Sequence, residues 1–156
     1  MTIFYIFSGT IAYLFLSYGQ VTALHFDSEI ERFIYGGKES ELHLQVLPDG
    51  KTLVLKPKAK ALTANLLIFT AKEKYNFHLR IKSPAHELVE IKTATNNLSY
   101  KLIRREPAFD LLEGASSLLL KNKQASPIVV NAQTISHFAY LSKGAPLFIG
   151  HEQIYP

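Results

Sequence analysis

The stretch that decides the fold runs from residue 21 to residue 81: VTALHFDSEIERFIYGGKESELHLQVLPDGKTLVLKPKAKALTANLLIFTAKEKYNFHLRI. Within it, the apolar residues of ELHLQVL at 41–47 alternate with polar ones, which is the two-residue period of a strand with one buried face. The PDGK at 48–51 is typical of a turn, because proline presets φ and glycine accepts a positive φ. The apolar alternation resumes after this turn, so we predict a β-hairpin.

Two further strands are expected toward the end of this stretch. Residues 65–70 are almost continuously apolar, which predicts a central strand covered on both faces. In YNFHLRI at 75–81, apolar and polar residues alternate without a break, so Phe77 and Leu79 should be buried. No long segment has the 3.6-residue period of a helix. The only helical candidates are the leader described below and a turn or two around 107–112.

The remainder of the chain predicts a second small β domain. A short strand is expected at 88–91, and the polar stretch 93–97 contains two adjacent asparagines, which is typical of a linker. Short apolar runs then recur about every ten residues, separated by Gly, Pro, Asn and Lys; they lie at 98–103, 117–120, 128–130, 138–141 and 147–149. We therefore predict an all-β protein with an antiparallel β-sandwich in residues 21–92, a linker in 93–97 and a second small β domain in 98–156.

Residues 1–20 are predicted to be a signal peptide or N-terminal leader. Residues 3–16 are apolar except for a short SGT interruption, and this run is shorter than the roughly 18 residues that span a bilayer comfortably. Small residues follow it, as at a cleavage site. No Lys or Arg precedes Arg32, so the basic region of an ordinary signal peptide is missing. An uncleaved anchor and a buried segment remain the alternatives.

The composition excludes several classes of protein. The 156 residues include 17 Lys and Arg against 13 Asp and Glu, and the formal charge of +4 is too small to indicate a nucleic-acid groove. The lysines of 56–60 and the Arg104-Arg105 pair are expected to be solvated surface, so no direct nucleic-acid binding is expected. The absence of cysteine excludes disulfides, thiolate zinc sites and a lipoprotein lipobox.

No pattern in the sequence indicates catalysis. The six histidines lack HxxxH and HExxH spacing, and neither a GxSxG elbow nor a glycine-rich phosphate loop is present. His25, His43 and His78 lie in expected strands, where they either converge on a metal across a sheet or stand alone at the surface. The alternating acids of DSEIE at 27–31 fit an ion site or, better, a solvated strand face. We predict a protein that is not an enzyme and has no catalytic residue, cofactor or metal.

Several phrases, in order, carry a resemblance to a known family. They are FDSEIER at 26–32, KP at 56–57, ANL at 64–66, PAHEL at 84–88 and AYLSKGAPL at 139–147. The chain resembles the TraK-like periplasmic outer-core subunits of bacterial type IV secretion and conjugation systems, a group that includes TrbG and CagX. The resemblance covers residues 21–90 well and the rest loosely. Relatives continue with further strands beyond the point where this chain stops, so either a short variant or an incomplete second domain is expected.

The resemblance implies a structural subunit of an envelope-spanning secretion or DNA-transfer core complex. Its implied partners are copies of itself in a ring, an outer-membrane lipoprotein and an inner-membrane-anchored channel subunit, and its implied location is the periplasm, in association with the outer membrane. The alternative is a monomeric periplasmic β-sandwich that binds a peptide or glycan or acts as a chaperone. Open sheet edges accept partner strands, so the predicted partner interface lies on the first strand and a basic loop: Thr22, Leu24, Phe26, Lys56, Lys58 and Lys60.

Overall fold

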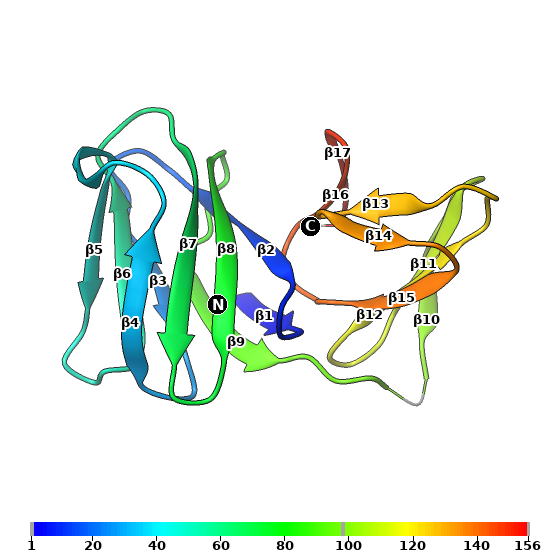
Figure 1. Cartoon of the computed structure of the whole chain (residues 1–156), viewed down its shortest axis with the longest axis horizontal. Helices are drawn as coiled ribbons and strands as arrows, with labels where there is room; N and C mark the ends of the chain where they lie inside the picture. The colour runs from blue at the N-terminus through cyan, green and yellow to red at the C-terminus, as the bar shows by residue number, and fades with distance from the viewer. Residues whose placement is uncertain (1, 98, 156) are drawn as a thin grey trace.

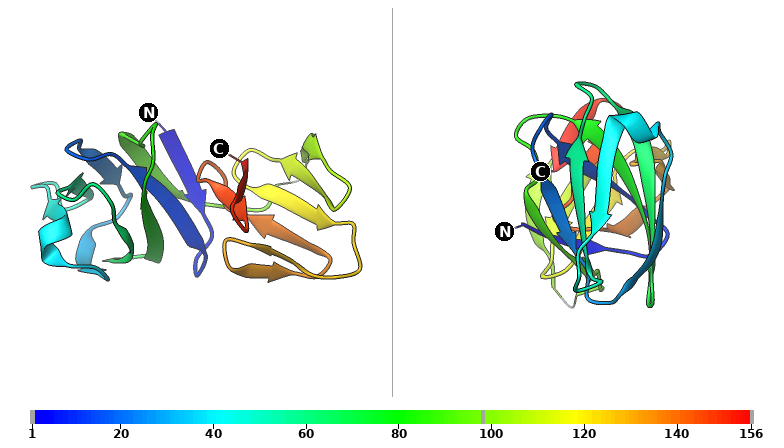
Figure 2. Two further views of the ribbon diagram at one scale, coloured as in Figure 1. Left: turned by 90° about the horizontal axis from the view of Figure 1, so that it is seen from above. Right: turned by 90° about the vertical axis from the view of Figure 1, so that its left-hand side faces the viewer.

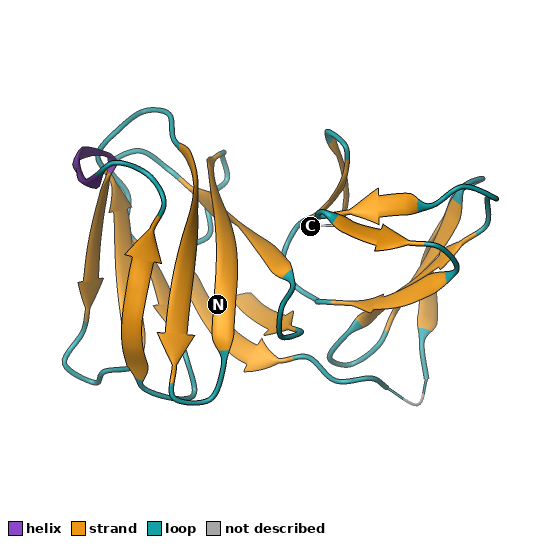
Figure 3. Cartoon of the chain, in the orientation of Figure 1, coloured by secondary structure: helices purple, strands orange, loops and turns teal. Residues whose placement is uncertain are grey.

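The computed structural model describes residues 2–97 and 99–155, which form two β units side by side (Figure 1). Strands dominate both units, and the single short 3₁₀ helix of the described residues is η1 (Glu39–Glu41) (Figure 3). The all-β sandwich class predicted from the sequence is confirmed. In the described part of the chain, no helix has the length and apolar character needed to cross a membrane.

The first unit is a sandwich of two mixed sheets. Its strands are β1 (Thr2–Ile6), β2 (Ile11–Leu16), β3 (Thr22–His25), β4 (Ile30–Tyr35), β5 (Leu42–Val46), β6 (Thr52–Pro57), β7 (Thr63–Thr70), β8 (Lys74–Ile81) and β9 (Leu88–Thr93). One sheet has the order β1-β9-β3-β6-β5 and the other the order β2-β8-β7-β4. The inward side chains of both sheets form one apolar core, as expected when every strand buries alternate residues.

The hairpin predicted at PDGK is confirmed as β5–β6. Gly50 has a φ of 72°, and one carboxylate oxygen of Asp49 accepts hydrogen bonds from the backbone N–H groups of Lys51 and Thr52 at 2.9 and 3.0 Å. These bonds favour the charged carboxylate and lower the pKa of Asp49. The turn is therefore held by its own side chain, and it fixes the register of the two strands.

The burial predicted along β8 is also confirmed. Phe77 and Leu79 are fully buried, whereas His78 between them is on the outer face. β7 occupies the predicted interior position between β8 and β4. The expectation that both its faces are covered is wrong, because Leu67 and Phe69 on the outer face keep part of their surface exposed.

Three strand pairs of the sandwich are parallel: β1 with β9, β3 with β9, and β2 with β8. The sequence pattern predicts an antiparallel arrangement because neighbouring strands in the sequence usually pair as hairpins. Here the first two strands pair with strands far along the chain, and a long connection permits either direction. Alternation of apolar residues fixes the buried face of a strand and leaves its direction open.

Residues 2–16 are part of the sandwich in this structure. β1 and β2 are edge strands of the two sheets, and Phe4, Leu14 and Leu16 are fully buried in the core. The packing of these residues supports the alternative of a buried segment, and the signal peptide or leader stays a prediction. The packing has a physical reason: the SGT interruption at 8–10 is a turn around Gly9, which has a φ of 78°, so the apolar run is two strands.

The second unit is a four-stranded antiparallel sheet with two small hairpins. Its strands are β10 (Lys101–Arg105), β11 (Phe109–Glu113), β12 (Leu118–Asn122), β13 (Ile128–Val130), β14 (Gln133–Ile135), β15 (Phe138–Leu141), β16 (Leu147–Ile149) and β17 (Glu152–Tyr155). The sheet order is β10-β11-β12-β15, with β13–β14 and β16–β17 as hairpins. A second apolar core joins these elements. The predicted helical turn near 107–112 is wrong, because this segment enters β11 and pairs on both sides.

The predicted linker is short and tied to the second unit. Thr93 belongs to β9, and the chain then passes without strand structure through residues 94–97. Asn97 accepts hydrogen bonds at its side-chain oxygen from the N–H of Ser116 and the hydroxyl of Ser117, at 3.1 and 3.2 Å. Leu98 and Pro156, which begin and end the predicted second domain, lie outside the described residues.

The two units meet along the turn between β1 and β2 (Figure 2). The backbones of Tyr5 and Lys143 exchange two hydrogen bonds of 2.7 and 2.8 Å, and the N–H of Phe7 donates to the hydroxyl of Ser142 at 3.0 Å. Gly144 has a φ of 95° and lies directly against the carbonyl of Ile3, where a side chain has no room. The segment predicted as a leader is thus the part of the sandwich that holds the second unit.

Candidate functional site: a groove between the two units

The structure places the predicted edge strand in the interior of its sheet. β3 is hydrogen-bonded to β9 on one side and to β6 on the other. Thr22, Leu24 and Phe26 are at most 1% exposed. The prediction that these three residues form an open edge is therefore wrong, because the strands contributed by distant parts of the chain cover both sides of β3.

The other half of the predicted interface is accessible. Lys56 lies near the end of β6, and Lys58 and Lys60 lie in the loop that follows. All three lysines are exposed. Their role in binding a partner stays a prediction. The structure adds edges that the sequence did not indicate: β4 and β5 end the two sheets on the side away from the second unit, and Ile34 on β4 is 48% exposed (Figure 1).

The histidines considered for a metal do not converge. His25 and His43 belong to one sheet of the sandwich and His78 to the other. His25 instead contacts Thr52 at 2.9 Å and lies 3.9 Å from Asp49. Among residues 2–97 and 99–155, no group of three or more His, Asp or Glu side chains is arranged to hold a metal ion.

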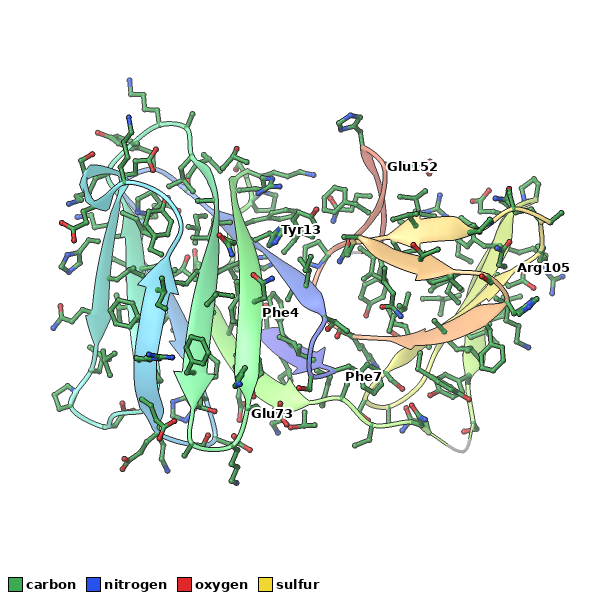
Figure 4. All side chains as sticks on the ribbon, viewed as in Figure 1. Phe4, Phe7, Tyr13, Glu73, Arg105 and Glu152 are labelled. Atoms are coloured by element: carbon green, nitrogen blue, oxygen red, sulfur yellow. The ribbon has the colours of Figure 1, made fainter. Side chains whose placement is uncertain are left out.

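A groove lined by aromatic and basic side chains lies where the second unit meets β2 and β8. Tyr13 and Phe15 project from the outer face of β2, and Arg80 projects from the neighbouring strand β8, where its register partner is Phe15. The second unit contributes Phe148 from β16. Figure 4 shows Tyr13 in the space between the two units.

Two cavities share this groove. The cavity that we name the Phe148 cavity has a volume of about 430 Å³, and its lining consists of Tyr13, Phe15, Arg80, Ile81, Lys82, Phe148, Gly150 and His151. The His86 cavity has about 480 Å³, and its lining consists of Thr2, Phe15, residues 82–88 and Gln153. Phe15 and Lys82 line both cavities, so these two residues form the partition between them.

Lys82 is the central cation of the groove. Its ammonium lies 4.9 Å from the centre of the Phe15 ring and 5.5 Å from that of Phe148, and it donates a hydrogen bond of 2.8 Å to the side-chain oxygen of Gln153. Arg80 lies 5.2 Å from the centre of the Tyr13 ring. Cation–π contacts of this kind contribute about 0.5–1 kcal/mol each at exposed sites. The two cations are therefore positioned on aromatic rings, and the guanidinium of Arg80 also donates a hydrogen bond of 2.8 Å to the carbonyl of Leu79.

His86 supports the groove from beneath. Its ring stacks on Phe15 with centroids 5.2 Å apart, and it meets Phe4 edge-on at 5.1 Å. The N–H of Phe15 donates to Nδ1 of His86 at 2.9 Å, and the N–H of His86 donates to the carbonyl of Phe15 at 2.9 Å. Burial disfavours the charged imidazolium and lowers the pKa of His86 to about 4. His86 is therefore a neutral acceptor at ordinary pH.

The groove is electropositive. The described residues that line the Phe148 cavity include Arg80, Lys82 and His151 and no carboxylate. Across residues 2–97 and 99–155, no Asp or Glu lies within 4.0 Å of the charged groups of Arg80 and Lys82. Burial, together with the nearby guanidinium of Arg80, lowers the pKa of His78 on the same face. The arrangement favours binding of an anion.

Sequence reasoning missed this groove. Its parts come from β2, which the sequence assigns to a leader, and from β16, which is far away along the chain. The sequence contains one indication of the groove. Arg80 on the outer face of β8 and Lys82 directly after β8 are two basic residues that are two positions apart, as expected for neighbours on one face of a strand.

Comparison with known proteins gives no relative: no protein-family model matches the chain, and no curated protein matches it. The resemblance to secretion-core subunits therefore stays a prediction.

Proposed function

We propose that the chain is a structural subunit of an envelope-spanning type IV secretion or conjugation core complex, which acts by assembling with copies of itself and with partner subunits. The observation that carries the proposal is the pair of sheet edges, β4 and β5, on the side of the sandwich away from the second unit. Edge strands have main-chain groups available for another chain. A periplasmic location follows from this role and rests on the family resemblance.

The positions of the family-like phrases support the same proposal. The phrase at 26–32 forms the turn from β3 into β4, KP at 56–57 ends β6, and PAHEL at 84–88 leads into β9. These three phrases lie at strand ends of the sandwich, whereas ANL at 64–66 lies inside β7 and AYLSKGAPL at 139–147 lies in the second unit. A signal peptide is not part of the proposal, because β1 and β2 are strands of the sandwich and contribute buried residues to its core.

Photo-crosslinking in the native host tests the assembly role. A photoreactive phenylalanine analogue replaces Ile34 on the β4 edge, and the matched control replaces Lys92, which is exposed on β9. We expect adducts with a second copy or with envelope secretion subunits from position 34 and few from position 92. If position 34 gives no adduct with any protein while the variant is folded, the edge-assembly proposal is wrong.

A second candidate function is a monomeric binding module for a peptide or glycan. The groove at Lys82 favours it, because two cavities of about 430 and 480 Å³ are within the size range of ligand sites. Light scattering on the purified full chain separates the two candidates. A monomer at all concentrations favours the binding module, and concentration-dependent oligomers favour the assembly subunit.

A further inference from the structure

The outer edge of β2 is only partly free, because the main-chain groups of Phe15 on that edge are already bonded to His86. β2 is the last strand of its sheet and pairs with β8 alone. The N–H and carbonyl of Phe15 bond to His86, away from β8. Because alternate residues of a strand direct their main-chain groups to the same side, those of Ile11 and Tyr13 also face away from β8. An extended peptide can therefore align beside this edge as an added strand.

The charged groups beside this edge select for a negative charge. The Phe148 cavity contains Arg80 and Lys82 and no carboxylate, whereas the His86 cavity contains Glu87. An anion is thus favoured on the Phe148 side of Lys82. The bond to Gln153 uses one of the three ammonium protons of Lys82, which leaves donors for an incoming ligand.

The rings of the groove are already covered, which favours a carboxylate over a nucleic-acid base. Phe15 is only 6% exposed, with His86 stacked on it and Lys82 against it. Binding of single-stranded nucleic acid depends on aromatic faces that are free to stack with bases. Here the accessible groups are the cation heads, which bind a carboxylate through charge-assisted hydrogen bonds.

We propose that the groove binds an extended acidic peptide, with a side-chain carboxylate of the peptide held by Lys82 and Arg80 and its backbone alongside β2. The proposal rests on the second of the two functions above and narrows it to one class of ligand. Lys82 recognises the negative charge of the carboxylate, and the contacting rings of Tyr13 and Phe148 together form one wall of the site. The ring centroids of Tyr13 and Phe148 are 5.0 Å apart, so the two units are in contact at this wall and the site is built from both of them.

An NMR titration of the ¹⁵N-labelled full chain tests the proposal. The probes are two capped pentapeptides, Val-Thr-Glu-Val-Thr and the uncharged Val-Thr-Gln-Val-Thr, together with a short oligothymidylate. We expect the glutamate peptide to shift the amide signals of Tyr13, Lys82 and Phe148 and to bind at least about tenfold more tightly than the glutamine peptide.

Three variants assign the selectivity to Lys82. Lys82→Gln should remove the preference for glutamate, Lys82→Arg should keep it, and Lys74→Gln, which changes an exposed lysine outside the groove, should leave it unchanged. Melting curves establish that each variant is folded. Equal affinity for both peptides at the groove overturns the carboxylate inference and leaves the binding module standing. Preference for oligothymidylate, or no shift at the groove with either peptide, overturns the peptide proposal.

Discussion

Truncation of Phe4 gives a direct test of the role of the N-terminal residues. Phe4 has no exposed surface and packs edge-on against His86. Phe→Ala substitutions in cores cost about 3–5 kcal/mol, from lost burial and from the cavity left behind. Since whole domains are stable by only about 5–15 kcal/mol, Phe4→Ala should remove a large share of the stability of the sandwich.

Urea unfolding of the full chain, followed by far-UV circular dichroism, measures this loss. With a slope of about 2 kcal/mol per molar urea, the midpoint of the sandwich transition should fall by about 2 M. The matched control is Tyr18→Ala, which truncates an aromatic residue that is 52% exposed and should change the free energy of unfolding by less than about 0.5 kcal/mol. Equal midpoints for the two variants would show that residues 2–16 are outside the core and would refute the packing described above.

Three further predictions follow from the same contacts. Phe77→Ala should lower the free energy of unfolding by about 3–5 kcal/mol and His78→Ala by far less, and equal melting shifts would mean that the β8 register is wrong. Gly144→Ala should cost about 1–3 kcal/mol, because a Cβ at this positive φ collides with a carbonyl of β1; unchanged urea midpoints would contradict the docking of the two units. The pKa of His86 is about 4 in the folded chain and about 6.5 in the unfolded chain, so its contribution to the free energy of unfolding should be complete above about pH 6.5 and be lost as the pH falls toward 4. The loss should be smaller than the roughly 3 kcal/mol of a fully buried group with this shift, because His86 is partly exposed to solvent. A His86→Gln variant with the same pH dependence would refute this assignment.

The sequence predicts the middle of the sandwich well because its strands and turns depend on residues that are close together in the sequence. Alternation places Phe77 in the core, and the PDGK turn joins β5 to β6 without help from the rest of the chain. Both features depend on residues that are neighbours in the sequence. For the same reason the sequence predicts strands β13, β15 and β16 at their observed bounds.

The first two strands could not be predicted because their outer faces are also apolar. Tyr13 and Phe15 project from the outer face of β2, where Phe148 of the second unit packs against both rings. Because the inner and the outer face of β2 both carry apolar residues, apolar and polar residues do not alternate along the segment. Its composition is therefore that of a leader. The tertiary contact that explains these aromatic residues lies far along the chain, and no local pattern reveals it.

The packing of residues 2–16 links the fold to the proposed binding site. Phe4, Leu14 and Leu16 fill the core, while Tyr13 and Phe15 of the same segment line the groove. A mature protein without this segment would lose an edge strand from each sheet, the backbone bonds to Lys143 and the groove together. Peptide binding at Lys82 and removal of residues 1–20 are therefore mutually exclusive. N-terminal sequencing of the protein from its host decides between them: a mature chain that begins after residue 20 would rule out the groove, and retention of residues 2–16 is what the structure requires.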